Sequence, residues 1–276
     1  MAIVSVENLK MSYDKGRVKA LKGVTFDVEE GEIFGLIGPD GAGKTSLFRI
    51  LTTLLLADSG KAVVDGMDVV NDYKKIRQHI GYMPGRFSLY QDLTVEENLS
   101  FFATVFNTTI EENYHLVEDI YRQIEPFKKR KAGKLSGGMK QKLALSCALI
   151  HAPHVLFLDE PTTGVDPVSR KEFWEMLQKL KKNFKLSIVV STPYMDEALQ
   201  CDRIALIQDG QFLTIDTPEN IIRTYTQTLW SLRSDKMHKL LTDLRGIDGV
   251  KTAFAFGENH HATIDTSVLT VDSLRN

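Results

Sequence analysis

The sequence has few cysteines, no long hydrophobic run and no export signal, and each absence excludes a class of protein. Its two cysteines, Cys147 and Cys201, lie far apart and form neither a disulfide framework nor a metal-binding spacing. A reducing cytosol is therefore the expected environment. No apolar run approaches the ~18 residues of a membrane span, and Glu7 is an acidic residue too early for a signal peptide. We therefore expect any contact with a membrane to run through a partner protein.

A strong charge of either sign is also missing. The 276 residues include 34 basic and 36 acidic side chains, which leave a formal net charge of −2. A nucleic-acid-binding domain usually has a clear basic excess, so no nucleic-acid partner is expected. With 43% hydrophobic residues, a chain of this length can bury one full core and a small second domain.

Short strands that alternate with helices predict an α/β fold built around a parallel sheet. Residues 24–28 alternate with period two, and the apolar run 33–37 is typical of a buried parallel strand. Further central strands are expected at 154–158 and 187–190, with a crossover helix at 169–182 between them.

The last quarter of the sequence has a different character. Asp209-Gly210 predicts a hairpin turn between strands at 203–208 and 212–215. After Pro218 the pattern is that of a small β-α-β-β appendage. Its elements are expected at 229–233, 236–245, 250–256 and 261–266.

A glycine-rich loop follows the strand at 33–37 directly and leads into a helix expected at 46–56. Its sequence is Gly38-Pro39-Asp40-Gly41-Ala42-Gly43-Lys44-Thr45, which is the P-loop pattern in its strand-to-helix context. Backbone N–H groups of residues 41–45 would surround a β-phosphate, and the Lys44 ammonium would reach the β and γ oxygens. The Thr45 hydroxyl would ligate Mg²⁺. A chance glycine loop is the minor alternative.

An acidic motif supplies the other half of this chemistry. The apolar strand Val155-Leu156-Phe157-Leu158 ends in Asp159 and Glu160. Asp159 can hold the Mg²⁺ shell, and Glu160 is placed to orient or deprotonate a water molecule. Alone, two acids after a strand would more often be a surface turn, but beside a P-loop the catalytic interpretation is favoured. Glu160 is therefore the predicted catalytic residue, and Thr45 and Asp159 are the predicted Mg²⁺ ligands.

A second turn suited to a phosphate lies in Leu135-Ser136-Gly137-Gly138-Met139-Lys140-Gln141. Its glycines let backbone N–H groups approach an anion closely, and a helix from Met139 to about Ile150 adds the positive end of its dipole. On its own the turn could be an ordinary helix cap. Two such turns in one chain suggest a nucleotide held between them.

In combination, these motifs resemble the ATP-binding-cassette (ABC) ATPases over roughly residues 3–220. The resemblance rests on the order of Walker A (Gly38–Thr45), the LSGG signature (Leu135–Gln141), Walker B (Val155–Asp159, with Glu160) and a D-loop-like Gly164-Val165-Asp166-Pro167. The runs at 135–142, at 163–170 and at Tyr194-Met195-Asp196-Glu197-Ala198 are most similar to the ATPase subunits of ABC-2-type exporters.

The resemblance implies a P-loop (RecA-like) core with an antiparallel β subdomain and a helical signature subdomain at about 94–150, together forming residues 1–222. Residues 223–276 would form the small α+β appendage. The end at Asn276 would fit the N-terminal half of a tandem ATPase, cut just past this appendage. ATP and Mg²⁺ are the implied cofactors.

The implied nucleotide site is shared between two ATPase halves that pack head to tail. In the chain's own site, Tyr13 would stack on adenine, with a half-buried strand aromatic as the alternative. The full set of predicted ATP-binding residues is Tyr13, Gly38, Pro39, Asp40, Gly41, Ala42, Gly43, Lys44, Thr45 and Ser46. The residues predicted to act on the partner's nucleotide are Leu135, Ser136, Gly137, Gly138 and Gln141, with Asp166 in the D-loop.

The resemblance also implies two kinds of partner, namely transmembrane permease subunits and a second ATPase half. The permease would hold the chain at the cytoplasmic face of the cell membrane. A soluble regulatory ABC-type ATPase is the alternative function. A P-loop kinase is disfavoured, because such an enzyme does not need an LSGG turn.

Two positions depart from the family pattern where it contacts the γ-phosphate and its water. The chain has Tyr82-Met83-Pro84-Gly85 where Tyr-x-Pro-Gln is usual, and Ser191-Thr192-Pro193 where Ser-Thr-His is usual. Neither Gly85 nor Pro193 offers a side-chain hydrogen bond. Asp40 also adds a negative charge at the loop rim, where Asn or Ser is commoner.

These departures predict a site that binds ATP and hydrolyses it slowly. Removing one preorganised donor typically slows turnover by ~10² to 10³. Lys44 and Thr45 are present, so binding should survive. The intact signature would then complete the competent site of a partner half. The alternative is that other groups position the water and the replacements are tolerated.

Overall fold

The computed structural model describes residues 1–224, 227–256 and 258–270, which form two compact units, Met1–Glu219 and Asn220–Asn276. The division lies inside α8 (Pro218–Thr224), close to the boundary predicted between 222 and 223. Residues 271–276, with which the predicted appendage ends, lie outside the described residues.

An antiparallel sheet in the order β2-β1-β4-β5 forms one layer of the first unit. Its strands are β1 (Ala2–Tyr13), β2 (Val18–Glu29), β4 (Ser59–Val64) and β5 (Met67–Asp68). Val24, Phe26 and Val28 are buried between exposed neighbours, as in a sheet with one covered face. Regular alternation is confined to this part of β2, which is why the sequence indicates only 24–28 of the longer strand.

A second sheet of six strands has the order β10-β9-β3-β8-β7-β6. Its strands are β3 (Ile33–Ile37), β6 (Ile80–Met83), β7 (Val155–Asp159), β8 (Ser187–Thr192), β9 (Arg203–Gln208) and β10 (Gln211–Asp216). All are parallel except β10, which pairs antiparallel with β9. Asp209 and Gly210 join these two strands with φ values of 50° and 77°, as a tight hairpin turn requires.

The central strands β3, β7 and β8 are buried at every residue, because parallel strands are covered on both faces. The helices around the sheets are α1 (Lys44–Leu51), α2 (Tyr73–His79), α6 (Pro167–Phe184) and α7 (Met195–Ala198). Phe48 of α1 meets Phe157 of β7 edge to face, with ring centroids 5.9 Å apart. This contact fixes the helix that follows the glycine-rich loop against the strand that ends in Asp159. The predicted α/β fold class is confirmed.

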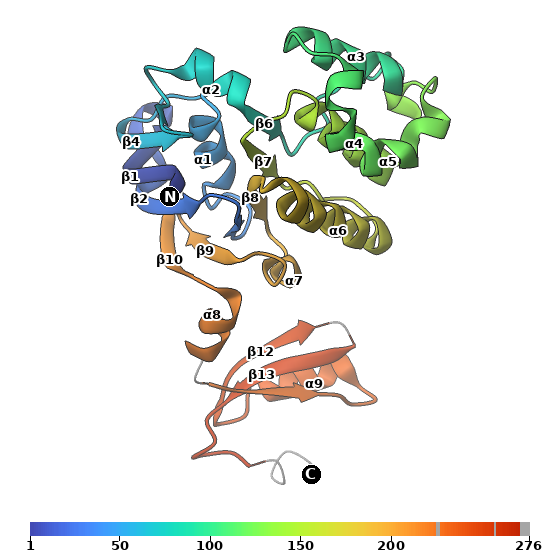
Figure 1. Ribbon diagram of the computed structural model, residues 1–276. Coiled ribbons are helices and arrows are strands. Elements are labelled where there is room, and N and C mark those ends of the chain that lie inside the picture. Colours follow the sequence, from blue (N-terminus) through green and yellow to red (C-terminus); the bar gives the residue numbers. More distant parts are fainter. Residues whose placement is uncertain (225–226, 257, 271–276) are drawn as a thin grey trace. The chain divides into compact units, whose positions relative to one another are not determined.

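Three further helices gather beyond β6 and β7 (Figure 1). They are α3 (Val95–Val105), α4 (Ile110–Ile124) and α5 (Gly137–Leu149). Capping boxes begin α3 and α4, where Thr94 pairs with Glu97 and Thr109 pairs with Glu112. Short 3-10 turns occur at Asp14–Gly16, Glu125–Phe127 and Ala132–Lys134.

The second unit contains β11 (Thr228–Leu232), α9 (Met237–Leu244), β12 (Val250–Phe256) and β13 (Asn259–Ile264). Its antiparallel sheet has the order β11-β13-β12. Leu244 of α9 is buried with Ala253, Ala262 and Ile264 of the strands, so the unit has a core of its own. Across the described residues of both units, no helix has the length and apolar character to span a membrane.

Asn98 in α3 ties the loop before that helix to its first turn. The side chain is fully buried. Its Oδ1 accepts from the Tyr90 N–H at 3.0 Å, and its Nδ2 donates to the carbonyl oxygens of Tyr90, Leu93 and Thr94. One amide side chain therefore ties this loop to α3, in addition to the backbone hydrogen bonds that the loop accepts from the N–H groups of Ala132 and Gly133.

We expect Asn98→Ala to lower the free energy of unfolding by about 2–3 kcal/mol, because it removes four hydrogen bonds of a buried side chain and leaves the Tyr90 N–H without its acceptor. Urea unfolding of the purified chain measures this loss. Asn71→Ala is the matched control, since the Asn71 amide makes its bond to Asp68 on an exposed surface. A loss no larger than in the control would contradict the bracing role of Asn98.

Candidate functional site

The glycine-rich loop between β3 and α1 has a shape that requires glycine. Gly41 and Gly43 have φ values of 79° and 107°, in the left-handed region that favours this residue. A Cβ atom at Gly43 would lie 2.3 Å from the Ala20 carbonyl oxygen. The chain therefore turns directly into α1, whose first N–H groups lie at the loop, where a phosphate is commonly bound.

Lys44 lies inside this loop with only 3% of its side chain exposed. Its Nζ donates to the carbonyl oxygens of Gly38 at 2.8 Å and Pro39 at 3.0 Å. It also forms an ion pair with Glu160 Oε1 at 3.1 Å. The structure thus brings the predicted phosphate-binding ammonium and the predicted catalytic carboxylate into contact.

The two acids after β7 are held by one serine of the neighbouring strand. Ser191 Oγ donates to Asp159 Oδ1 at 2.7 Å and accepts from the Glu160 N–H at 3.0 Å. Glu160 has a φ of 51°, a conformation that costs energy for a residue with a side chain and is held by its surroundings. Sequence reasoning missed Ser191. The available signal was a polar residue directly after the apolar run 187–190.

Thr45 and Asp159 offer the oxygen ligands that Mg²⁺ prefers. Asp159 is buried, with a hydrogen bond to its Oδ1, and Thr45 is the second residue of α1. Burial, with the nearby Asp159 charge, raises the pKa of Tyr82 in the adjacent strand to about 12. The donor set therefore fits Mg²⁺, with both predicted ligands at the carboxyl edge of the sheet.

Tyr13 reaches the same loop from the antiparallel sheet. It is the last residue of β1, and its hydroxyl lies 3.0 Å from Ser46 Oγ in α1. About a third of the residue is exposed, at 37%. An aromatic face is thus available beside the helix that follows the glycine-rich loop.

The turn at Ser136-Gly137-Gly138 begins α5. Ser136 is the N-cap, and its hydroxyl accepts from the Met139 N–H at 3.4 Å. A Cβ atom at Gly138 would lie 2.6 Å from Ser169 Oγ, whereas one at Gly137 would have its nearest neighbour at 3.6 Å. Gly138 is therefore needed for the close approach of α5 to the start of α6.

The D-loop meets the signature turn at that same serine. Asp166 caps α6 by accepting from the Ser169 N–H at 3.0 Å. Hydrogen bonds from the Ser169 backbone and side chain hold the pKa of Asp166 below its usual value. Among the described residues, no hydrogen bond or ion pair joins the signature turn to the P-loop, and Figure 1 shows α5 and α1 on different sides of β6 and β7.

Gly85 and Pro193 lie beside the P-loop and the two acids. A Cβ atom at Gly85 would lie 3.0 Å from the Asp159 carbonyl oxygen and 3.8 Å from Glu160 Cβ. Pro193 follows Thr192, whose carbonyl oxygen accepts from the Gly38 N–H at 3.4 Å. Gln91, the first glutamine after Gly85, does not replace the missing amide, because its backbone and side chain lie beside Gly133, whose N–H donates to the Gln91 carbonyl oxygen.

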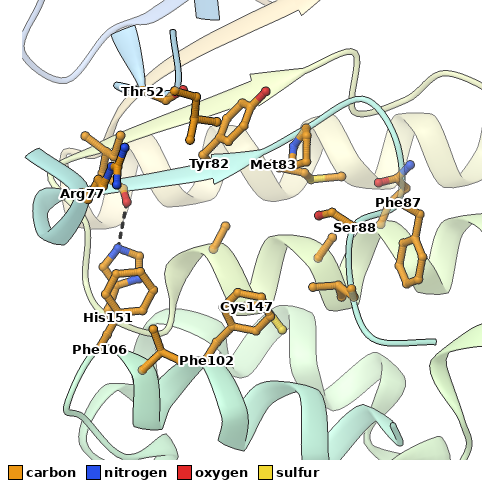
Figure 2. A pocket seen from close by; sticks show the side chains of 18 residues that line it. Thr52, Arg77, Tyr82, Met83, Phe87, Ser88, Phe102, Phe106, Cys147 and His151 are labelled. Carbon is orange, nitrogen blue, oxygen red and sulfur yellow. Dashed lines mark hydrogen bonds between the residues drawn. The ribbon is translucent and has the colours of Figure 1, made fainter. Parts of the chain in front are cut away.

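An apolar cavity of about 400 Å³ lies next to this region, between β6 and the helices α3 and α5 (Figure 2). Phe87, Phe102 and Phe106 line it, with Cys147 and Gln141 from α5. His151 Nε2 bonds the Ile80 carbonyl oxygen at 2.9 Å, and the ring stacks on Phe106. Burial lowers the pKa of His151 and raises the pKa of the Cys147 thiol, so both are neutral at pH 7.

Comparison with known proteins gives consistent matches. Residues 21–163 match the family described as ABC transporter. The probable multidrug ABC transporter ATP-binding protein YbhF of Escherichia coli (strain K12) is 42% identical over 221 residues, covering 78% of this chain and 38% of the relative. The doxorubicin resistance ATP-binding protein DrrA of Mycobacterium tuberculosis (strain ATCC 25618 / H37Rv) is 33% identical over 280 residues, covering 100% of this chain and 80% of the relative.

Solved structures agree with these sequence matches. CbiO1 from Clostridium perfringens, part of the ABC transporter complex cbiONQ, has a TM-score of 0.72 and 28% identity, covering 81% of this chain and 91% of that one. The dimeric ATP-binding cassette MJ0796 bound to ADP and Pi has a TM-score of 0.70 and 26% identity, with 78% and 98% covered. The chain spans 38% of the length of the YbhF relatives that it matches.

Replacing Lys44 with Met should weaken ATP binding by roughly 10- to 100-fold, because hydrogen bonds to a charged group contribute about 1.5–3 kcal/mol. Calorimetric titration with ATP and Mg²⁺ measures the change. Lys181→Met is the matched control, since Lys181 forms its ion pair with Asp202 away from the loop. Equal ATP affinity in the Lys44 variant and the wild type would contradict the predicted role.

Replacing Gly138 with Ala should lower the free energy of unfolding by about 1–3 kcal/mol, because the added methyl group overpacks the contact with Ser169. Gly137→Ala is the control and should not destabilise the chain. Thermal unfolding compares the two variants. The second substitution Ser169→Gly should restore part of the loss, and equal melting temperatures for both alanine variants would show that the close contact is unimportant.

Proposed function

The chain belongs to the ABC transporter family of ATP-binding proteins, and from this premise we propose that it is the ATPase subunit of a membrane exporter with two unequal nucleotide sites. Its own P-loop site would bind ATP and hydrolyse it slowly. Its signature turn would complete the faster site of a second ATPase half. The proposal rests on one observation. Gly85 and Pro193 lie beside the P-loop and the two acids that follow β7, while the signature turn is intact.

Export is supported by the names of two relatives, a probable multidrug ABC transporter ATP-binding protein and a doxorubicin resistance ATP-binding protein. ATPase activity and the use of Mg²⁺ follow from the family. In the chain's own site, Lys44 and the N–H groups of residues 41–45 would bind the phosphates. Tyr13 would stack on the adenine ring. Thr45 and Asp159 would hold Mg²⁺, which supplies positive charge to the phosphate oxygens.

Glu160 would orient the attacking water, but only after it has left Lys44. In the described structure its carboxylate forms an ion pair with the ammonium that the γ-phosphate needs. A bound triphosphate would take over Lys44 and release Glu160 toward the water. With Gly85 and Pro193 in place, no side-chain amide or imidazole from these positions would share in holding that water, so turnover would be slow.

The signature turn supports a site shared between two halves. Figure 1 shows α5, which begins with this turn, on the other side of β6 and β7 from α1, and Ser136, Gly137 and Asp166 form an exposed surface there. We propose that this surface contacts the nucleotide of a second ATPase half, either a separate chain or another part of the same one. ATP-dependent closure of that dimer would drive transport.

The apolar cavity beside β6 is the proposed contact with the permease. Phe87, Phe102 and Phe106 give it an apolar lining, and the loop braced by Asn98 borders it. A short amphipathic helix from a cytoplasmic loop of the transmembrane subunit fits such a groove. The chain would then lie at the cytoplasmic face of the cell membrane. If detergent extracts never yield the chain together with a membrane-spanning protein, a soluble regulatory ATPase becomes the better interpretation.

Restoring the usual side chains should speed hydrolysis at the chain's own site. We expect the double variant Gly85→Gln, Pro193→His to raise ATP turnover of the isolated chain by at least about 10-fold, because each lost donor typically costs ~10² to 10³. The gain is expected to fall short of the full factor, since a Cβ at Gly85 lies only 3.0 Å from the Asp159 carbonyl oxygen. Arg86→Gln is the control, because it adds the same amide one residue further along the loop.

Steady-state phosphate release measures both variants. The slow site would be refuted if wild-type turnover is already near the common enzyme value of roughly 10 s⁻¹ and the double variant does not change it. In the assembly with its second half, Gly138→Asp should abolish most hydrolysis while Lys44→Met leaves most of it. If Lys44→Met instead abolishes most hydrolysis and Gly138→Asp leaves most of it, the chain's own P-loop carries the faster reaction.

A further inference from the structure

Three side chains that commonly bind metal ions meet in the first unit, although they lie far apart in the sequence. His79 Nδ1 and His154 Nδ1 lie 2.7 Å and 2.8 Å from the same oxygen of Asp65, Oδ2. One potential ligand atom from each residue lies within 4.8 Å of the other two. The nucleotide site uses none of the three.

The two histidines are placed by the parallel sheet. His79 is the last residue of α2, directly before β6, and His154 directly precedes β7. These strands are neighbours that begin in register at Ile80 and Val155, and the His154 N–H donates to the His79 carbonyl oxygen at 2.8 Å. The rings meet edge to face with centroids 4.8 Å apart. Both imidazoles are therefore set side by side by the backbone.

Asp65 is placed from the other sheet by a tight turn between β4 and β5. Asp65 and Gly66 have φ values of 51° and 72°, and the Asp65 N–H donates to the Ile3 carbonyl oxygen at 2.7 Å. Asp is one of the few residues with a side chain that tolerates this conformation. The carboxylate, 20% exposed, is thus directed at the two rings before any ligand binds.

The atoms that meet in the cluster can serve as metal ligands. A metal ion would take the place of the hydrogen atoms between Asp65 Oδ2 and the two Nδ1 atoms, with both rings neutral and protonated at Nε2 instead. A plain hydrogen-bonded cluster is the competing interpretation, and the test below separates the two.

We propose that Asp65, His79 and His154 bind one divalent transition-metal ion such as Zn²⁺. A tetrahedral ion with bonds of about 2.0–2.2 Å needs ligand atoms about 3.3 Å apart. The distance from Asp65 Oδ2 to each Nδ1 therefore has to lengthen by about half an ångström. The histidine side chains are 40% and 57% exposed, which leaves room for that movement. Two imidazole nitrogens and one carboxylate oxygen favour Zn²⁺ or Ni²⁺ over Mg²⁺ and Ca²⁺.

An ion can reach this site from solution. Asp65 and His154 line an open hollow of about 750 Å³ in the first unit. With three protein ligands, water would complete the coordination shell. The bound ion would join the β4–β5 turn, the end of α2 and the start of β7, so binding should stabilise the first unit.

The test is a calorimetric titration of the full chain, without a histidine tag, with ZnCl₂. Excess Mg²⁺ in the buffer competes with Zn²⁺ for oxygen ligands such as those of the nucleotide site. We expect one Zn²⁺ per chain with a dissociation constant of about 10 µM or tighter. At a hundredfold excess over that constant, the melting temperature should rise by about 5–10 °C. Co²⁺ in place of Zn²⁺ should give visible absorption bands of a site with nitrogen and oxygen ligands.

Variants assign the binding to the three residues. His79→Gln and His154→Gln should each weaken Zn²⁺ binding at least about 10-fold, and the double variant at least about 100-fold. His115→Gln is the matched control, since His115 lines the same hollow and is no part of the cluster. Asp65→Asn keeps a residue suited to the turn and should also weaken Zn²⁺ binding at least about 10-fold. This variant tests the site even if a histidine variant is unstable.

Two results would overturn the proposal. One is a Zn²⁺ affinity weaker than about 1 mM in the wild type. The other is unchanged affinity and stoichiometry in the double histidine variant, verified as folded by its melting temperature in EDTA. Either result leaves a hydrogen-bonded cluster only, and neither bears on ATP binding.

Discussion

The nucleotide site depends on the contact between Lys44 and Glu160. Lys44 begins the helix after the glycine-rich loop and Glu160 follows β7, so their ion pair joins the two halves of the site. Ser191 completes this arrangement from a third strand, because its hydroxyl bonds both Asp159 and the Glu160 backbone. In this arrangement the chain's own carboxylate occupies the ammonium. In the proposed mechanism, a bound nucleotide would therefore replace Glu160 as the partner of Lys44.

Local patterns in the sequence identify the parts of this site that follow one another along the chain. The strand at 33–37, the glycine-rich loop and the strand before Asp159 are contiguous, so their order alone indicates a P-loop fold. β1 is missed because bulges at register shifts interrupt its alternation. The helix expected at 46–56 ends at Leu51, where Thr52 bonds back to Phe48 and Thr53 adopts a φ of 63°.

Local sequence patterns do not predict contacts between segments that are distant in the sequence. Ser191 lies 32 residues from Asp159, and its partner is set by the order of β7 and β8 in the sheet. The residues near His154 in the sequence do not have a metal-binding spacing. The side chains that it meets, Asp65 and His79, belong to other parts of the chain. The roles of the site residues remain predictions. Their positions, however, follow from strand order, which propensity and spacing do not determine.

The short strand β7 has a functional group at each end. His154 precedes its first residue and Asp159 is its last, and every residue between them is buried. At about 3.3 Å per residue the Cα atoms of His154 and Asp159 are roughly 17 Å apart. One buried strand thus sets the positions of two separate groups, and the contact of its Phe157 with Phe48 of α1 holds that strand in place.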